Sequence, residues 1–276
     1  MIPSVFILIN IQSMSHSRSI SLPSRPHPSV ANVEEHLCRV RSSATTSTSS
    51  FCNKLTDLND MYECLDDLLH LPIMNSCNSE EVLGASIRLL DMCNTTKDAF
   101  SQMRASVQEL ESSLRRREAD VSSKIGSYLI CSKRVNKMVS KSFINFRKSQ
   151  NKKSNETTAI LSLLREVEEV TITVFESLFS SVFSAKEASK QNRWSMVFKS
   201  TQTKSVHGAS EFQKMQMDLE ALYKKKMNMQ SDFSRIQETR KCLTALDMNM
   251  QQCEGDLDCL FRSLIKTRVT ILNSAN

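Results

Sequence analysis

The stretch that decides the fold runs from Val82 to Leu114 and reads VLGASIRLLDMCNTTKDAFSQMRASVQELESSL. Its core positions alternate at spacings of four and three residues without a slip, and we call them the central seam. They are Val82, Ser86, Leu89, Cys93, Thr96, Phe100, Met103, Val107, Leu110 and Leu114. This alternation predicts a long amphipathic helix with a coiled-coil-like seam. A second apolar row, Leu83, Ile87 and Leu90, predicts a wider buried stripe at its start, as in a bundle.

Turn-forming residues are scarce in the rest of the chain, with four glycines and five prolines in 276 residues. Together with 40% hydrophobic residues, 6% aromatics and 24% charged residues, this predicts a nearly all-helical protein with a core. The fold class expected is all-α, an elongated antiparallel helical bundle with coiled-coil-like long helices. We expect residues 1–28 to form a disordered N-terminal arm and residues 29–272 a single helical-bundle domain.

Cap and turn residues place the helix boundaries. Ser29 is expected to cap a first helix, and Asn78 with Glu81 forms a capping box at the start of the central one. No turn signal marks the end of the central helix, and we expect a break near Asp120. Either Asn155 or Thr157 should cap the next helix.

Two later segments are ambiguous. The β-branched residues from Thr171 to Val174 favour a strand locally, but the helical spacing on both sides favours a helix. After an expected loop at residues 190–208, a capping box at Ser210 opens a segment that ends near Ile271. Its seam includes Phe233 and shifts by one position from Leu243, which predicts one bent helix or two consecutive helices.

The segment from residue 121 to residue 153 is the clearest charge anomaly. It carries nine Lys and Arg residues and no acidic residue, whereas the net charge of the whole chain is +6. Its apolar residues keep a helical stripe, so we expect a basic amphipathic helix. The candidate surface for an anionic partner comprises this helix and the preceding arginine cluster: Arg115, Arg116, Arg117, Lys133, Arg134, Lys137, Lys141, Arg147 and Lys148.

Four interpretations of the basic helix remain open at this point. It could bind anionic lipid, because each Lys or Arg near such a membrane contributes about 1 kcal/mol. It could bind an acidic protein partner, or it could pack near the acidic helix face at residues 57–67 and otherwise face water. Nucleic acid is disfavoured, because Tyr128, Phe143 and Phe146 lie on the stripe expected to face the core.

Motifs of common enzyme classes are missing from the sequence. The four glycines do not form a phosphate-binding loop, and no catalytic triad or zinc spacing occurs. The nine cysteines contain no Cys-x-x-Cys pair, and we expect them to act as small buried side chains in a reducing compartment. We therefore predict a protein that is not an enzyme and has no cofactor or metal.

The N-terminal residues 5–11 resemble the apolar part of a signal peptide but lack a positive flank and a cleavage site. No uncharged apolar run reaches the length of about 18 residues that spans a bilayer. Met14 is a second candidate start. We expect a cytoplasmic protein, with peripheral membrane association as the alternative.

Several segments together resemble the plant-specific domain of unknown function 241 family, which is grouped with BYPASS-type regulators. They are SLPSRPHP (21–28), VEEHL (33–37), YECLDDLLHLP (62–72), SIRLLDMC (86–93), VQELESSLRRR (107–117) and LFRSLIKTRV (260–269). The resemblance implies an all-helical plant protein without assigned enzymatic activity. It also implies a regulatory role in root and shoot development through unknown protein partners, with membrane association as a further implication. It supplies no binding residues.

Overall fold

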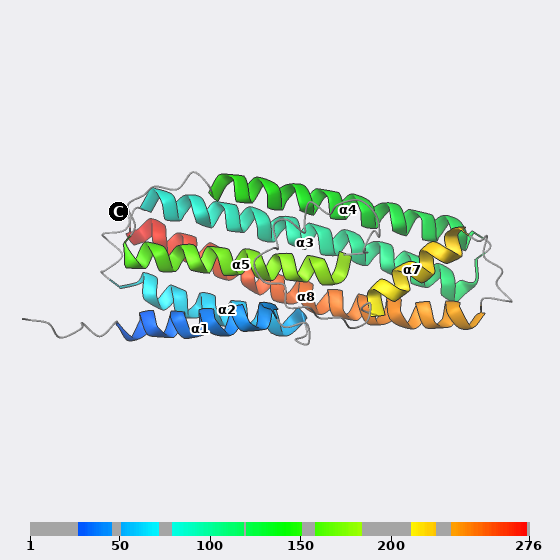
Figure 1. Ribbon diagram of the computed structural model, residues 1–276, viewed down its shortest axis with the longest axis horizontal. Helices are drawn as coiled ribbons and strands as arrows, with labels where there is room; N and C mark the ends of the chain where they lie inside the picture. Colours follow the sequence, from blue (N-terminus) through cyan, green and yellow to red (C-terminus); the bar gives the residue numbers. More distant parts are fainter. Residues whose placement is uncertain are drawn as a thin grey trace, which may run out of the picture.

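The computed structural model describes residues 27–45, 51–71, 79–118, 120–150, 158–183, 211–224 and 233–274. These ranges hold seven helices: α1 (Pro28–Thr45), α2 (Phe51–Leu69), α3 (Ser79–Arg116), α4 (Val121–Gln150), α5 (Ala159–Phe183), α7 (Glu211–Lys224) and α8 (Phe233–Ser274). No strand occurs in the described ranges. The all-α helical bundle expected from the sequence is therefore confirmed, including a helix through residues 171–174 (Figure 1).

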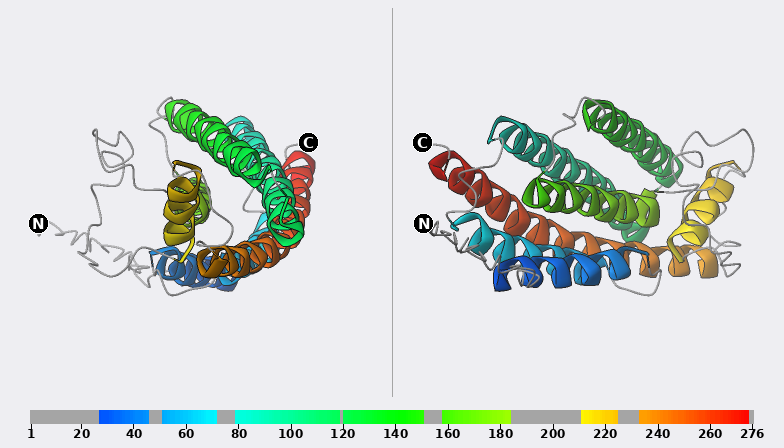
Figure 2. Two further views of the ribbon diagram at one scale, coloured as in Figure 1. Left: turned by 90° about the vertical axis from the view of Figure 1, so that its right-hand side faces the viewer. Right: turned by 60° about the vertical axis from the view of Figure 1, so that its left-hand side comes forward.

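The helices form a curved layer with two helices on its concave side. Viewed along the bundle, the layer runs from α4 through α3 and α8 to α2 and α1 (Figure 2). Helix α5 lies against α1, α2 and α3 at one end of the bundle, and α7 lies against α4 and α8 at the other. Helices α3 and α8 thus lie at the centre of the layer. Helix α3 contacts α4, α5 and α8, and α8 contacts α2, α3 and α7.

Neighbouring helices are antiparallel in only part of the bundle. Helix α3 is antiparallel to α4 and to α8, but α2 and α8 run in the same direction (Figure 1). Their register confirms this, because Asn59 donates to the Asp256 carbonyl (3.2 Å) and Asp66 accepts a hydrogen bond from Thr270 (2.9 Å). The predicted antiparallel arrangement is therefore wrong for this pair, whose contacting residues lie more than 190 positions apart along the chain.

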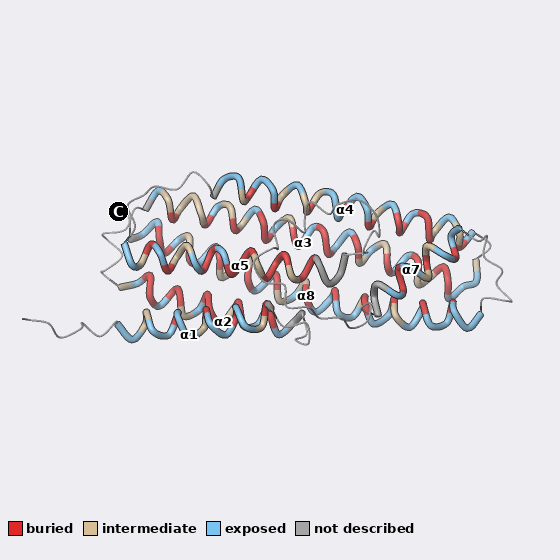
Figure 3. Tube along the Cα trace, in the orientation of Figure 1, coloured by how far each residue is buried: buried red, intermediate tan, exposed pale blue. Residues whose placement is uncertain are grey.

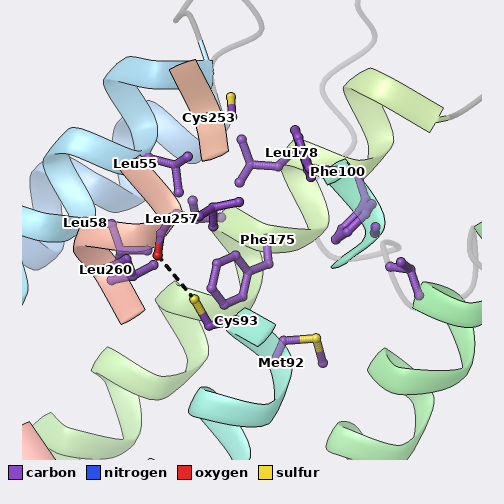
Figure 4. Packing of buried hydrophobic residues seen from close by; sticks show 14 of the residues in the cluster. Leu55, Leu58, Met92, Cys93, Phe100, Phe175, Leu178, Cys253, Leu257 and Leu260 are labelled. Carbon is purple, nitrogen blue, oxygen red and sulfur yellow. Dashed lines mark hydrogen bonds between the residues drawn. The ribbon is translucent and has the colours of Figure 1, made fainter. Parts of the chain in front are cut away.

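The central seam is buried along its whole length. All ten of its side chains are buried, so the sequence prediction for this helix is confirmed (Figure 3). Helix α8 covers much of it, and the Cys93 thiol lies 3.8 Å from the Leu257 carbonyl oxygen, to which it donates (Figure 4). Phe175 of α5 packs beside this contact in Figure 4. The second apolar row is less buried than expected, because Ile87 is 44% exposed and Leu83 and Leu90 are only half-buried.

Helices α3 and α7 begin at Ser79 and Glu211, directly after the predicted caps, whereas the starts of α1 and α5 differ from the sequence prediction. Helix α1 begins at Pro28, where a missing N–H costs nothing, and the His27 ring accepts from the Ser29 N–H (3.3 Å). Helix α5 is capped by Thr158, whose hydroxyl accepts from the Leu161 N–H at 3.2 Å. The predicted capping residues Asn78, Asn155, Thr157 and Ser210 lie outside the described residues, as do residues 1–26 of the expected arm and the expected loop at 190–208.

The C-terminal segment is two helices, but the break is not where the seam appeared to shift. Helix α8 continues without interruption through Leu243, and apart from Thr270 its buried positions keep a spacing of three and four throughout. They are Ile236, Thr239, Leu243, Leu246, Met250, Cys253, Leu257, Leu260, Leu264, Thr267 and Ile271. The polar Thr239 hid this register in the sequence. Phe233, expected in the seam, is 50% exposed.

Candidate functional site

The basic helix predicted from the sequence is α4, and its apolar stripe is buried against α3 and α7. The buried side chains include Val121, Ile125, Tyr128, Leu129, Val135, Val139, Phe143 and Phe146. The main contacts of the acidic helix α2 are with α1, α5 and α8. The interpretation in which the basic helix packs near residues 57–67 is therefore wrong.

The acidic face of α2 has other partners. Arg39 of α1 forms ion pairs with Asp57 (3.2 Å) and Asp60 (2.9 Å). Asp66 is buried and accepts a hydrogen bond from Thr270, while Lys266 lies 3.0 Å from its carboxylate. This acidic face is therefore not solvent-exposed along its whole length, because α8 packs over Asp66.

Arg147 points into the bundle and not outward. Its guanidinium forms a bidentate ion pair with Glu176 of α5, with Nη2 2.7 Å from both carboxylate oxygens and Nε 3.0 Å from one. The Glu176 side chain is 3% exposed. Burial raises the pKa of this carboxyl above its ordinary value, and Arg147 acts against that rise. Arg147 therefore fastens α4 to α5.

The other predicted basic residues of α4 face solvent. We call them, together with two exposed isoleucines between them, the α4 outer face: Ile130, Lys133, Arg134, Lys137, Lys141, Ile144 and Lys148. Apart from the adjacent pair Lys133 and Arg134, successive members are three or four residues apart, so they share one side of the helix. The four lysines have no hydrogen bond or ion pair with any described residue, and Arg134 meets only neutral groups, the Gln102 amide (3.4 Å) and the Cys131 thiol.

Sequence reasoning missed the two isoleucines, which are 69% and 52% exposed. The signal was present, because Ile130 and Ile144 fall on the spacing of the basic row and off the core stripe. From Ile130 to Lys148 the outer face is about 27 Å long at 1.5 Å per residue.

The three arginines before α4 form a separate region. Arg117 follows the last turn of α3 with φ of 53°. The Glu118 N–H bonds to the Ser113 carbonyl (3.3 Å) and the Arg117 N–H to the Leu114 carbonyl (3.4 Å), which is a Schellman turn. Arg116 pairs with Glu118 at 2.6 Å. The break therefore comes four residues before Asp120, with arginine where such turns usually have glycine.

Ion pairs also bind α5 to α3. Arg88 lies 2.8 Å from the buried Glu168, and Arg165 lies 2.9 Å from Glu81. Glu81, half of the predicted capping box, uses its side chain for this pair. With Arg147 and Glu176, these contacts place every strongly buried glutamate of the described chain in a structural ion pair.

No group of three or more His, Cys, Asp or Glu side chains that could hold a metal ion occurs among the described residues. Of the cysteines in the described ranges, Cys93 and Cys253 are buried, whereas Cys38 and Cys259 are exposed. The expectation of buried cysteines thus holds for only some of them. Within the same ranges, no helix has the length and apolar character needed to cross a bilayer.

The described structure is that of an all-helical bundle protein. Ion pairs such as those of Arg88, Arg147 and Arg165 join its helices. Residues 54–273 match the family described as Protein BPS1, and the chain belongs to this family. The family is plant-specific and of the type expected from the resemblance, and it is a family of non-catalytic developmental regulators. No curated protein and no solved structure matches the chain.

Proposed function

We propose that this protein is a non-enzymatic interaction protein of the cytoplasm that acts in root and shoot development. In this proposal it binds an acidic protein partner through the α4 outer face. The observation that carries the proposal is that the five cations of this face lack acidic partners in the described part of the chain. Membership in the Protein BPS1 family supports the developmental role.

The spacing of the lysines supports an external partner. Lys133, Lys137 and Lys141 are four residues apart on one helix. Like charges at this spacing destabilise a helix by a few tenths of a kcal/mol per pair. Carboxylates from a partner would remove this repulsion and add attraction, because the outer face contains no acidic residue of its own.

Charge reversal tests this proposal in the plant. The variant carries Lys137→Glu and Lys141→Glu, and its matched control carries Lys214→Glu and Lys241→Glu, two exposed lysines on α7 and α8. In plants lacking the gene, we expect the control to restore root and shoot growth and the variant to fail. Both proteins should melt at similar temperatures, since surface substitutions change stability by about 0.5 kcal/mol or less. Full rescue by the variant would contradict the proposal.

A second candidate function is binding to an anionic membrane surface. The two exposed isoleucines favour it, because Ile130 and Ile144 lie among the cations of the same helix face. Basic helices with apolar side chains on the membrane side bind at the lipid headgroup boundary. The aromatic residues Tyr128, Phe143 and Phe146 are buried, so they are not available to stack on nucleic-acid bases.

Pelleting with vesicles distinguishes the two candidates. We would compare phosphatidylserine-containing vesicles with phosphatidylcholine vesicles at low and high salt. Membrane binding predicts salt-sensitive pelleting that is lost when Lys133, Lys137 and Lys141 are changed to Glu and weakened when both isoleucines are changed to Ser. Pelleting that ignores salt, or that survives charge reversal, would exclude α4 as the membrane-binding element.

A further inference from the structure

A hollow of about 310 Å³ lies at the end of the bundle where α3 turns into α4 and α8 begins. Three arginines line it, Arg115 and Arg117 from the turn and Arg240 from α8. Leu114 and Ile236 are buried beneath them, and Phe233 borders the hollow with half of its surface exposed. In Figure 1 this region is the right-hand end, away from the C-terminus.

The three guanidinium groups have different surroundings. The Arg117 guanidinium lies over the Phe233 ring, 5.3 Å from its centroid. Arg240 lies 3.3 Å from the Glu111 carboxylate. Arg115 is exposed and has no hydrogen bond or ion pair with a described residue. Among the described residues, Glu111 is the one carboxylate that pairs with these three groups, so they keep a surplus of two positive charges within the described structure.

We propose that this hollow binds a compact phosphate monoester that carries an aromatic or aliphatic group. The arginines would hold the phosphate, because guanidinium groups donate paired hydrogen bonds to phosphate oxygens. Phe233 and Ile236 would contact the organic group. The volume lies at the lower end of the range for small-molecule pockets, which fits a one-ring ligand.

A phosphate monoester suits the hollow better than a carboxylate. It carries nearly two negative charges at neutral pH and three strong acceptor oxygens. A carboxylate has one charge and two oxygens, so it would leave part of the cationic surplus unbalanced. The proposal does not rest on the α4 outer face, since the cations of that face first appear at Lys133, about 18 Å along α4 from its first residue.

Calorimetric titration of the full chain with phenyl phosphate tests the proposal. We expect saturable binding to one site and weaker binding of inorganic phosphate, which lacks the ring. Benzyl alcohol, which lacks the phosphate, should not bind detectably. The affinity should rise as the pH is raised through about 6, because the second phosphate proton is lost there.

Two variants remove one arginine each, and a third is the control. Arg115→Gln and Arg117→Gly should each weaken phenyl phosphate binding about tenfold or more, the usual loss for a hydrogen bond to a charged group. Arg116→Gln is the matched control, because Arg116 belongs to the same turn and carries the same charge but does not line the hollow. Its affinity should stay within about twofold of the wild type.

Folding is checked separately. Arg117 has a left-handed backbone that glycine adopts more easily, so Arg117→Gly should melt no lower than the wild type while losing affinity. The absence of phenyl phosphate binding would overturn the proposal. Equal losses in all three variants would also overturn it, since they would show a general effect of surface charge.

Discussion

The cations on the two sides of α4 differ in their partners. On the inner side, Arg147 pairs with the Glu176 carboxylate, whose side chain is 3% exposed, and Phe143 and Phe146 of the same helix are buried. On the outer side, four lysines and one arginine share a face with no carboxylate partner in the described chain. Burial turns an unpaired charge into a cost of several kcal/mol, whereas water largely screens it. Arg147 on the inner side therefore stabilises the fold, whereas the cations on the outer side are available to bind a partner.

The largest effect should come from breaking the inner pair. Changing Arg147→Met leaves Glu176 buried without its partner and should destabilise the protein by about 3–5 kcal/mol at pH 7, measured by urea denaturation. The matched change on the outer side, Lys148→Met, keeps the same helix end and should have little effect. Equal losses of unfolding free energy in the two variants would contradict the difference between the inner and outer sides of α4.

The loss in Arg147→Met should depend on pH. Without the guanidinium, burial drives the pKa of Glu176 further above its ordinary value of 4.5. Below pH 4.5 the carboxyl is protonated in both the folded and unfolded chains, so no buried charge penalises folding. As the pH rises above 4.5 the unfolded chain releases the proton first, which favours unfolding. We expect a smaller deficit near pH 4.5 than at pH 7; a deficit that grows on acidification would contradict this reasoning.

Removing the hydroxyl group from either of two buried tyrosines should change stability by an intermediate amount. The Tyr62 hydroxyl lies 2.9 Å from the Thr171 hydroxyl, whereas the Tyr128 hydroxyl on the inner side of α4 has no hydrogen-bond partner in the described structure. Tyr62→Phe should therefore cost about 1 kcal/mol. Tyr128→Phe should be neutral or stabilising, because it removes a buried polar group without a partner. Thermal melts of both variants compare them directly, and a larger loss at Tyr128 would show that its hydroxyl is satisfied.

The smallest effect on stability should come from the outer side. Changing Lys137→Gln and Lys141→Gln together should alter the free energy of unfolding by less than about 0.5 kcal/mol, with a slight gain at low salt as repulsion is relieved. Denaturation at two ionic strengths measures this. A loss above about 1 kcal/mol would show that these lysines stabilise the bundle.

Helix positions followed from the sequence because seam spacing is a local property. Each residue of the central seam is buried, and the helix through Thr171 was decided correctly by spacing against β-propensity. The same logic failed at Thr239, where one polar residue in the buried row of α8 suggested a shift that does not exist. Spacing also could not show that α2 and α8 are parallel, since that depends on contacts between distant segments.

The candidate site was predicted by residue type but not by arrangement. The sequence predicted one surface of nine cations. The structure divides them among the outer face, the inner pair at Arg147 and the turn at Arg115 to Arg117. Arg240 could not be found, because it lies far along the chain from the turn it faces. Charge counts identify cations, but only tertiary contacts show which of them have partners.

The position of α8 along the chain determines when the apolar side of α3 is covered during synthesis. Of the described helices it is made last, yet it lies along α3 from Arg104, which pairs with Asp247 and Glu254, to Ser86, which meets Arg268. While α8 is still unmade, the apolar side of α3 that faces it has no cover. The nascent chain therefore presents a long apolar surface until α8 has been made, a state that is prone to aggregation. A truncation that removes α8 should therefore leave an aggregating chain and not a smaller bundle.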